Sequence, residues 1–248
     1  KAKKILKLNK ILTKSGLLVN KTKNLYKSYN YIKKNKFPYI IGKLACSSNL
    51  YILRNNFHIT NNHSRSVAHL LRYENQGILT SYKTINSDNP KLSCRIAGLE
   101  KFSPVKIVID KDLKIKLNSY IVKYSSKPKT IIFHNSKNIS KIKKLKSKRV
   151  KLVNFKVGDD NYFDLKKIFK KIYKLGIHTL LIEGGNTLTY SMISKRLFNE
   201  FYLFKSNKIL NNKGKINVLN IKRNLDKKFK NKNFVNTYLE KDSLIHYY

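Results

Sequence analysis

From residue 38 onward, short apolar runs recur along the chain between polar turns. Runs of this kind, rich in β-branched and aromatic residues, predict strands. We expect strands at 38–46, 77–82, 105–110, 130–134, 150–155, 178–182, 200–204, 234–239 and 243–248. None of the runs approaches the length of about eighteen apolar residues that a membrane-spanning helix requires, so no membrane segment is expected.

Segments with helical periodicity separate most of these runs. We expect helices from Thr60 or Asn61 to Gly77, at 136–145, at 165–175 and at 187–195, with Val67, Leu70 and Leu71 as the apolar face of the first. Asp164 is placed to cap the third helix, and Gly176 is placed to end it. Strands alternating with helices are typical of an α/β fold with a mostly parallel central sheet, and the two closing strands suggest an antiparallel edge.

Residues 1–36 have a different character. They are rich in Lys, only weakly periodic, and broken by a turn at Ser15-Gly16, with no apolar core of their own. We interpret 1–36 as the end of a preceding domain with its linker, and 37–248 as a separate domain. The chain starts at Lys1 rather than at Met, which suggests a fragment or a processed product. The start of the chain lacks the continuous apolar stretch of a secretory signal.

The charge of the chain is extreme but evenly spread. The 54 basic and 13 acidic residues give a formal net charge of +41, while 41% of the residues are hydrophobic, which excludes a disordered basic tail. Nucleic-acid binders concentrate charge on one face and favour Arg, whereas here Lys predominates from end to end, with local concentrations at 141–151 and 222–232. Compositional drift of an AT-rich coding sequence explains this better than selected binding of a polyanion. The positive field would still attract phosphorylated ligands.

Cysteine and histidine give no sign of a metal centre. The two cysteines, Cys46 and Cys94, form no CxxC pair and no disulfide framework is expected, so the expected compartment is a reducing cytoplasm. His63 and His69 share a predicted helix but are six positions apart, and therefore do not present a joint metal face. Cys46 ends an apolar strand and is expected to be a packed residue rather than a nucleophile.

The strongest candidate for a ligand site is the turn Glu183-Gly184-Gly185. A buried strand ends there, and an amphipathic helix follows from about Thr187. Glycine lets the backbone approach a ligand closely, and the first amides of a helix attract anions. Glu183 stands at the carboxyl end of a strand, where open α/β sheets bind ligands. An ordinary strand-to-helix turn would explain the same residues, and this segment alone does not decide between the two.

Other candidate groups lie near the ends of neighbouring strands. Asp110 ends one strand, and the loop after another carries Thr84, Asp88 and Arg95. Arg95 suits a phosphate because a guanidinium binds it bidentately, and Arg72 either does the same or lies on the surface. Six acids in polar runs are expected to be solvated: Asp112, Asp159, Asp160, Asp226, Glu240 and Asp242.

Together, these segments resemble the reductase domain of the bifunctional riboflavin-biosynthesis deaminase/reductase. The resemblance extends from about residue 37 to the end of the chain. It is carried by Pro38–Ser47, Ile59–Arg72, Thr84-x3-Asp88-x-Pro90-x-Leu92-x2-Arg95 and Glu183-Gly184-Gly185-x-Thr187-Leu188, with Asn199-Glu200 after them. The resemblance implies a dihydrofolate-reductase-like fold, and it implies that 1–36 are the tail of a deaminase domain whose zinc motifs are absent here.

The activity that the resemblance implies is NADPH-dependent reduction of 5-amino-6-(5-phosphoribosylamino)uracil to its ribitylamino product, with hydride delivered to C1′ of the opened sugar. A homodimer without a specific nucleic-acid partner is also implied. The residues that would hold NADPH are Cys46 (through its backbone), Thr84, Asp88, Gly185, Asn186, Thr187 and Leu188. Those that would hold the substrate are Arg72, Leu92 and Arg95, with both arginines on its phosphate. The catalytic groups would be Glu183, beside the reacting sugar, and Lys43, near the pyrimidine.

The chain departs from the family pattern at several positions. Ser47-Ser48-Asn49-Leu50 stands in place of Ser-Leu-Asp-Gly, and unusual residues occur at Asn56, His58, Asn89 and Lys111. We therefore transfer no roles to 47–58 or to Lys111. Two alternatives stay open. One is a polyanion-binding protein on an inactive reductase scaffold, and the other is a dihydrofolate-reductase-like enzyme acting on a different pterin or pyrimidine.

Overall fold

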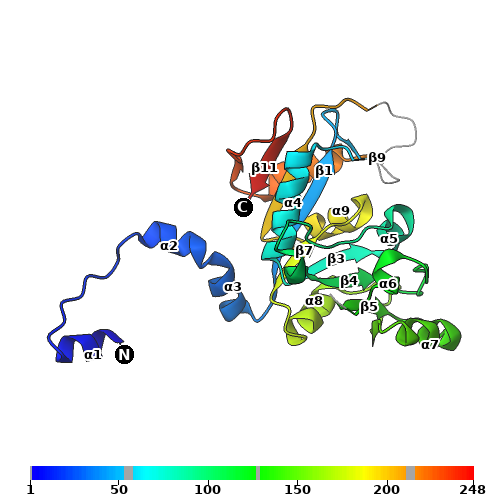
Figure 1. Cartoon of the computed structure of the whole chain (residues 1–248), viewed down its shortest axis with the longest axis horizontal. Coiled ribbons are helices and arrows are strands. Elements are labelled where there is room, and N and C mark those ends of the chain that lie inside the picture. Colours follow the sequence, from blue (N-terminus) through cyan, green and yellow to red (C-terminus); the bar gives the residue numbers. More distant parts are fainter. Residues whose placement is uncertain (1, 53–57, 127–128, 211–215) are drawn as a thin grey trace. The chain divides into compact units, whose positions relative to one another are not determined.

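The computed structural model describes residues 2–52, 58–126, 129–210 and 216–248, and the chain divides into two compact units, Lys1–Lys36 and Phe37–Tyr248. The first unit consists of α1 (Ala2–Leu8), α2 (Val19–Leu25) and α3 (Lys27–Asn35), labelled in Figure 1. No residue of α1 or α3 is buried, so these two helices contribute no apolar core.

The second unit is built on a nine-stranded sheet. Its strands are β1 (Tyr39–Cys46), β3 (Gly77–Ser81), β4 (Val105–Ile109), β5 (Thr130–His134), β6 (Lys151–Asn154), β7 (Thr179–Ile182), β8 (Glu200–Lys205), β10 (Lys232–Phe234) and β11 (Ser243–Tyr247). A second, two-stranded sheet pairs β2 (Tyr51–Ile52) with β9 (Ile216–Asn217).

The large sheet is parallel except at one edge. Its order is β10-β11-β8-β1-β7-β3-β4-β5-β6, which places β7 between β1 and β3. All pairings from β8 through β6 are parallel, and those of β11 with β8 and β10 are antiparallel. The expected fold class, a mostly parallel α/β sheet with antiparallel C-terminal strands, is confirmed.

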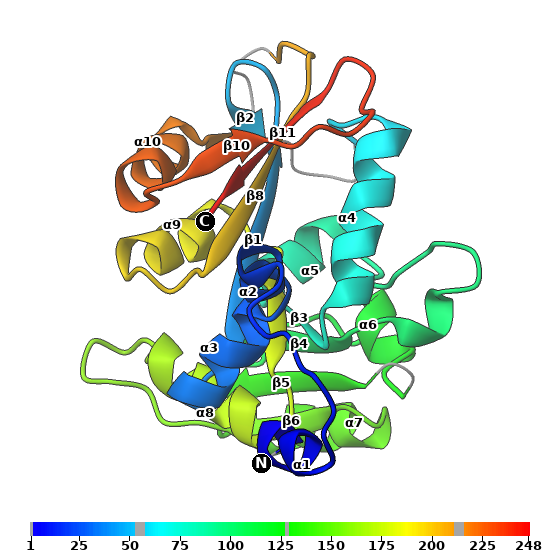
Figure 2. The ribbon, with the colours of Figure 1, turned by 90° about the vertical axis from the view of Figure 1, so that its left-hand side faces the viewer.

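Helices cover both faces of the sheet, as Figure 2 shows. On one face lie α4 (Asn62–Glu74), α5 (Tyr82–Asp88), α6 (Tyr120–Lys123) and α7 (Ile139–Ser147); on the other lie α8 (Leu165–Lys174), α9 (Asn186–Ser194) and α10 (Leu219–Lys228). Successive residues of β7 alternate between the two cores, because Leu181 packs on the α4 side while Leu180 and Ile182 pack on the α8 side. None of the described helices has the length and apolar character needed to cross a bilayer.

The helix ends follow local capping chemistry. The Asn61 side chain accepts a hydrogen bond from the Ser64 amide at 2.9 Å and caps α4. Asp164 caps α8 by accepting from the Lys166 and Lys167 amides. Gly176 follows α8 with φ +82°, a left-handed conformation that suits glycine, so both ends of this helix lie where the sequence predicts them.

Six of the described helices were not expected, namely α1, α2, α3, α5, α6 and α10, and two of them show why. The segment after β3, expected to be a polar loop, begins with α5, which buries Ile85. The Asn86 side chain donates to the carbonyl of 114 and accepts from the amide of 116, and the Asn89 side chain accepts from the amide of 120. The Lys-rich run after residue 218 forms α10, whose Ile221 and Leu225 are buried. In both segments apolar residues are too few to reveal the helix.

Three finer expectations were wrong. Leu70, expected on the apolar face of α4, is 41% exposed, and Ala68 is buried instead. The strand expected at 234–239 lies at Lys232–Phe234. Asp242, expected to be solvated, accepts hydrogen bonds from the Asn61 amide (2.9 Å) and the Ser64 hydroxyl (2.8 Å), and so ties the last hairpin to the start of α4.

Candidate active site

A cavity of about 860 Å³ opens at the carboxyl ends of the three adjacent strands β1, β7 and β3. Its walls come from the end of β1, from α4, from α5 and from the turn between β7 and α9. Because β3 leads into α5 on one face of the sheet and β7 leads into α9 on the other, the chain diverges here and leaves a crevice. The volume is in the upper range for small-molecule sites. Within the described ranges, no three His, Cys, Asp or Glu side chains group closely enough to hold a metal ion.

The turn after β7 presents backbone amides to this cavity. Gly185 is the N-cap of α9, and its carbonyl accepts the first hydrogen bond of the helix at 3.1 Å. The amides of 186–188 precede that bond, and these residues line the cavity. A Cβ at Gly184 would lie 3.0 Å from Leu188 Cδ2, whereas a Cβ at Gly185 would have Thr84 Oγ1, 3.8 Å away, as its nearest neighbour. The turn and the start of α5 therefore form one wall that can receive an anion.

The acid of this turn is locked in an ion pair. Arg72, from α4, donates to both oxygens of Glu183, with Nε to Oε1 at 2.7 Å and Nη2 to Oε2 at 2.9 Å. The two side chains are only 13% and 14% exposed. Burial alone would raise the pKa of Glu183, but the Arg72 charge and its hydrogen bonds outweigh burial and lower that pKa to about 2. Glu183 is thus a carboxylate at neutral pH, and it can accept hydrogen bonds without donating a proton.

Lys43 lies on β1 at the same cavity. Burial lowers its pKa, an effect that the Arg72 charge reinforces and the Glu183 charge opposes. Its Nζ lies 5.5 Å from the centroid of the Phe204 ring. Lys43 is therefore a more acidic ammonium group than a solvated lysine.

Arg95, one of the two arginines expected to bind the phosphate, donates a hydrogen bond to a histidine. Arg95 Nε donates to His69 Nε2 at 3.1 Å, and His69 Nδ1 lies 3.1 Å from the Ser93 carbonyl oxygen. Burial and the charges of Arg72 and Arg95 lower the pKa of His69 to about 4, and neither the Ser93 hydrogen bond nor the Glu183 charge restores it. The ring is neutral at physiological pH.

Several residues that line the cavity were not predicted as site residues, and three of them carry a guanidinium or an imidazole. Arg65 and His69 lie on α4, and His58 precedes it. Arg65 donates to the Thr60 carbonyl at 2.7 Å. Spacing could have revealed two of them, because positions 65, 69 and 72 share one face of a helix. The unusual residue at Asn56 lies outside the described residues.

Of the remaining predicted site residues, some line the cavity and others do not. Thr84, in the first turn of α5, and Asp88, its last residue, line the cavity. Cys46 and Leu92 do not line it. Leu92 is 2% exposed and packs in the core, and burial raises the pKa of the Cys46 thiol to about 11, so only the backbone of either residue is suited to ligand contact. Asp110 is buried away from the cavity, where it accepts hydrogen bonds from the amides of 114 and 115.

Comparison with known proteins identifies relatives of the chain. Residues 48–230 match the family described as the RibD C-terminal domain. The riboflavin biosynthesis protein RibD of Aquifex aeolicus is 34% identical over 152 residues, which are 61% of this chain and 40% of that protein. The chain spans about half the length, or less, of the first curated relatives that it matches.

Two further similarities concern a shorter relative and a solved structure. A protein of Aquifex aeolicus named 2,5-diamino-6-ribosylamino-4(3H)-pyrimidinone 5′-phosphate reductase is 24% identical over 135 residues, covering 54% of this chain and 58% of its own. The structure of Acinetobacter baumannii RibD matches with a TM-score of 0.75 at 15% identity, covering 98% of this chain and 67% of that one. At that identity the structural match supports the fold.

Proposed function

Since the chain belongs to the family of RibD C-terminal domains, we propose that it reduces 5-amino-6-(5-phosphoribosylamino)uracil to the 5-phosphoribitylamino compound with NADPH. The observation that carries the proposal is the composition of the cavity. The side formed by α9 and α5 offers helix amides and the Thr84 hydroxyl, and the α4 side offers Arg65 with Arg95 beside it. The Glu183 carboxylate, held by Arg72 of α4, lines the same cavity. NADPH and the phosphorylated substrate are both anionic, and the hydride must pass from one to C1′ of the other, so a site that binds an anion on each side is required.

The residues on the α9 side fit a dinucleotide cofactor. The amides of 186–188 and the helix dipole suit a pyrophosphate, and the open space at Gly185 lets it approach the backbone. We assign Thr84, Asp88 and the Cys46 backbone to the rest of the same molecule. Bound there, NADPH supplies the hydride.

The residues on the α4 side fit a phosphorylated sugar. Arg95 is exposed and suits the phosphate, with Arg65 adding positive charge nearby. Arg72 was expected on the phosphate as well, but its Nε and Nη2 groups are taken up by Glu183, so we assign it to holding that carboxylate. Glu183 accepts hydrogen bonds from the sugar hydroxyls and orients C1′.

Lys43 is the proposed proton donor. Hydride addition to C1′ of the open-chain imine leaves the neighbouring nitrogen in need of one proton. The Lys43 ammonium has a lowered pKa and faces the same cavity as Glu183, so it can give up that proton from Nζ and regain one from solvent.

The test is NADPH consumption, with a coupled deaminase supplying the substrate. Wild type should turn over, while Glu183→Gln and Arg95→Ala should each lose about tenfold or more in kcat/KM. Glu100→Gln and Arg223→Ala, which alter the same residue types outside the cavity, should behave as wild type. A well-folded wild type that does not oxidise NADPH would refute the proposal. Oxidation only with another pterin or pyrimidine would favour a different reductase.

Two properties of the longer relatives are carried over as proposals. We propose that a deaminase domain supplies the substrate, either fused ahead of residues 1–36 or as a separate protein. We also propose a homodimer. Size-exclusion chromatography with light scattering tests the second.

A further inference from the structure

His69 contacts the site through both ring nitrogens. Nδ1 lies 3.1 Å from the Ser93 carbonyl oxygen, and Nε2 lies 3.1 Å from Arg95 Nε. Arg72 Nη1 also lies 3.4 Å from Nδ1, but it donates to the Ser93 carbonyl at the shorter distance of 3.2 Å. Because a carbonyl only accepts and an arginine nitrogen only donates, the two 3.1 Å contacts place the ring proton on Nδ1 and a lone pair on Nε2. Both contacts therefore need the neutral ring in a single tautomer.

Arg95 depends on this contact for its orientation. The residue is exposed, and in the part of the chain that the structure describes neither of its Nη groups donates to a protein atom. An arginine side chain without such support samples many rotamers, and fixing it when a ligand binds costs conformational entropy. With Nε held by His69, the guanidinium plane is set and both Nη groups stay available for a bidentate contact with an anion.

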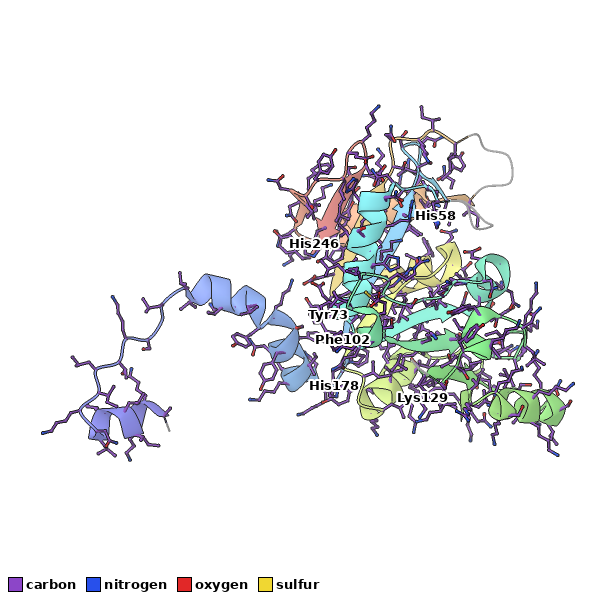
Figure 3. The ribbon with its side chains drawn as sticks, in the orientation of Figure 1. His58, Tyr73, Phe102, Lys129, His178 and His246 are labelled. Carbon is purple, nitrogen blue, oxygen red and sulfur yellow. The ribbon has the colours of Figure 1, made fainter. Side chains whose placement is uncertain are left out.

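The loop that carries Arg95 has other anchors. The Cys94 amide donates to the Ser103 hydroxyl at 3.1 Å, and the ring of Phe102 packs edge to face against Tyr73 of α4 with centroids 5.7 Å apart, both rings being labelled in Figure 3. Loss of the imidazole is therefore expected to release the Arg95 side chain and to leave the loop in place.

We propose that His69 is a positioning residue, which aims the Arg95 guanidinium at the phosphate of the sugar-phosphate ligand. The identity of that ligand rests on the proposed function. The positioning itself does not require turnover, so it can be tested by binding in the absence of NADPH.

The experiment compares variants at His69 with a matched control. His69→Leu removes both polar contacts, whereas His69→Gln keeps one acceptor and one donor on a single amide group. His63→Leu is the control, because His63 lies on the same helix with its side chain 47% exposed and outside the cavity. Titration calorimetry measures the Kd of each protein for 5-amino-6-(5-phosphoribosylamino)uracil and for its dephosphorylated form.

His69→Leu should weaken binding of the phosphorylated compound by about tenfold, the effect of one hydrogen bond to a charged group, and leave the dephosphorylated form unaffected. His69→Gln should recover most of the loss, and His69→Leu should have no further effect in Arg95→Ala. Equal weakening of both compounds, no weakening, or full additivity with Arg95→Ala would overturn the proposal, as would a wild type that does not distinguish the two compounds. Failure of the proposed function would appear separately, as wild type that binds but does not oxidise NADPH.

Discussion

Replacing Arg72 with Leu would leave the Glu183 carboxylate without its main partner. The substitution removes the guanidinium and keeps much of the apolar volume of the side chain. Both members of the pair are largely buried, and the carboxylate loses two hydrogen bonds of 2.7 and 2.9 Å. Glu183 is then a buried charge whose pKa is expected to rise.

The magnitude follows from the pKa of Glu183. Its pKa is lowered from 4.5 to about 2 in the folded protein, and at about 1.4 kcal/mol per unit this corresponds to about 3 kcal/mol of stability at neutral pH. The range for breaking a buried ion pair, about 3–5 kcal/mol, agrees. We therefore expect Arg72→Leu to lower the free energy of unfolding by about 3 kcal/mol at pH 7.

The pH dependence has a definite sign. A carboxylate with a depressed folded pKa contributes stability above its ordinary pKa of 4.5, and this contribution is lost as the pH falls towards about 2. In Arg72→Leu the pKa of Glu183 in the folded protein is raised. Acidification therefore protonates the buried carboxylate and reduces its destabilising effect in the variant, whereas it lowers the stability of wild type. The difference in stability between the two proteins should be largest near neutral pH and should shrink on acidification.

Urea unfolding followed by far-ultraviolet circular dichroism measures this difference, since the chain has no Trp to report by fluorescence. The double variant Arg72→Leu/Glu183→Gln is the control, and it should recover most of the lost stability because no buried charge remains. A loss below about 1 kcal/mol, a loss that does not change with pH, or a double variant no more stable than the single one would refute the reasoning.

Three further predictions concern other parts of the molecule. Gly42→Ala should destabilise the protein by about 3 kcal/mol in the same urea assay, because the new Cβ would lie 2.2 Å from Phe201 Cδ2 in the middle of the sheet; wild-type stability would contradict the packing described. Cys46 and Cys94 are buried, so a thiol reagent should label neither in the native protein and both in denaturant, and rapid native labelling would show that the core is open. Any nucleic-acid binding should be weak and non-specific, whereas nanomolar affinity that falls steeply with salt would favour the polyanion-binding alternative.

Local signals predicted much of the fold. The apolar runs at β1, β4 and β5 and the caps at Asn61 and Asp164 are readable because each depends on neighbouring residues alone. Helix α5 was not readable because partners in 114–120 hold it in place. In α10 the few apolar residues stand in a run of Lys and Asn, which conceals the helical spacing.

The site was predicted only in part, because some of its features depend on neighbouring residues and others depend on contacts between distant segments. The turn at Gly185 has a local signature, and so has the loop with Thr84 and Asp88. The pairing of Arg72 with Glu183 joins residues far apart in the sequence, and nothing near either residue indicates it. His69 was judged only as a metal ligand, and its acceptor role depends on a loop that folds back onto α4.

The position of β7 between β1 and β3 has a consequence for how the protein is made. Tyr39 in β1 pairs with Thr179 and Gly77 in β3 pairs with Leu180, so β7 joins two strands that leave the ribosome long before it. Until β7 emerges, β1 and β3 have no common neighbour, and the walls of the cavity are not yet together. Closing such long loops is slow. A nascent chain or a truncated product that ends before β7 is therefore expected to bind neither ligand, and ligand binding can report that the central sheet is complete.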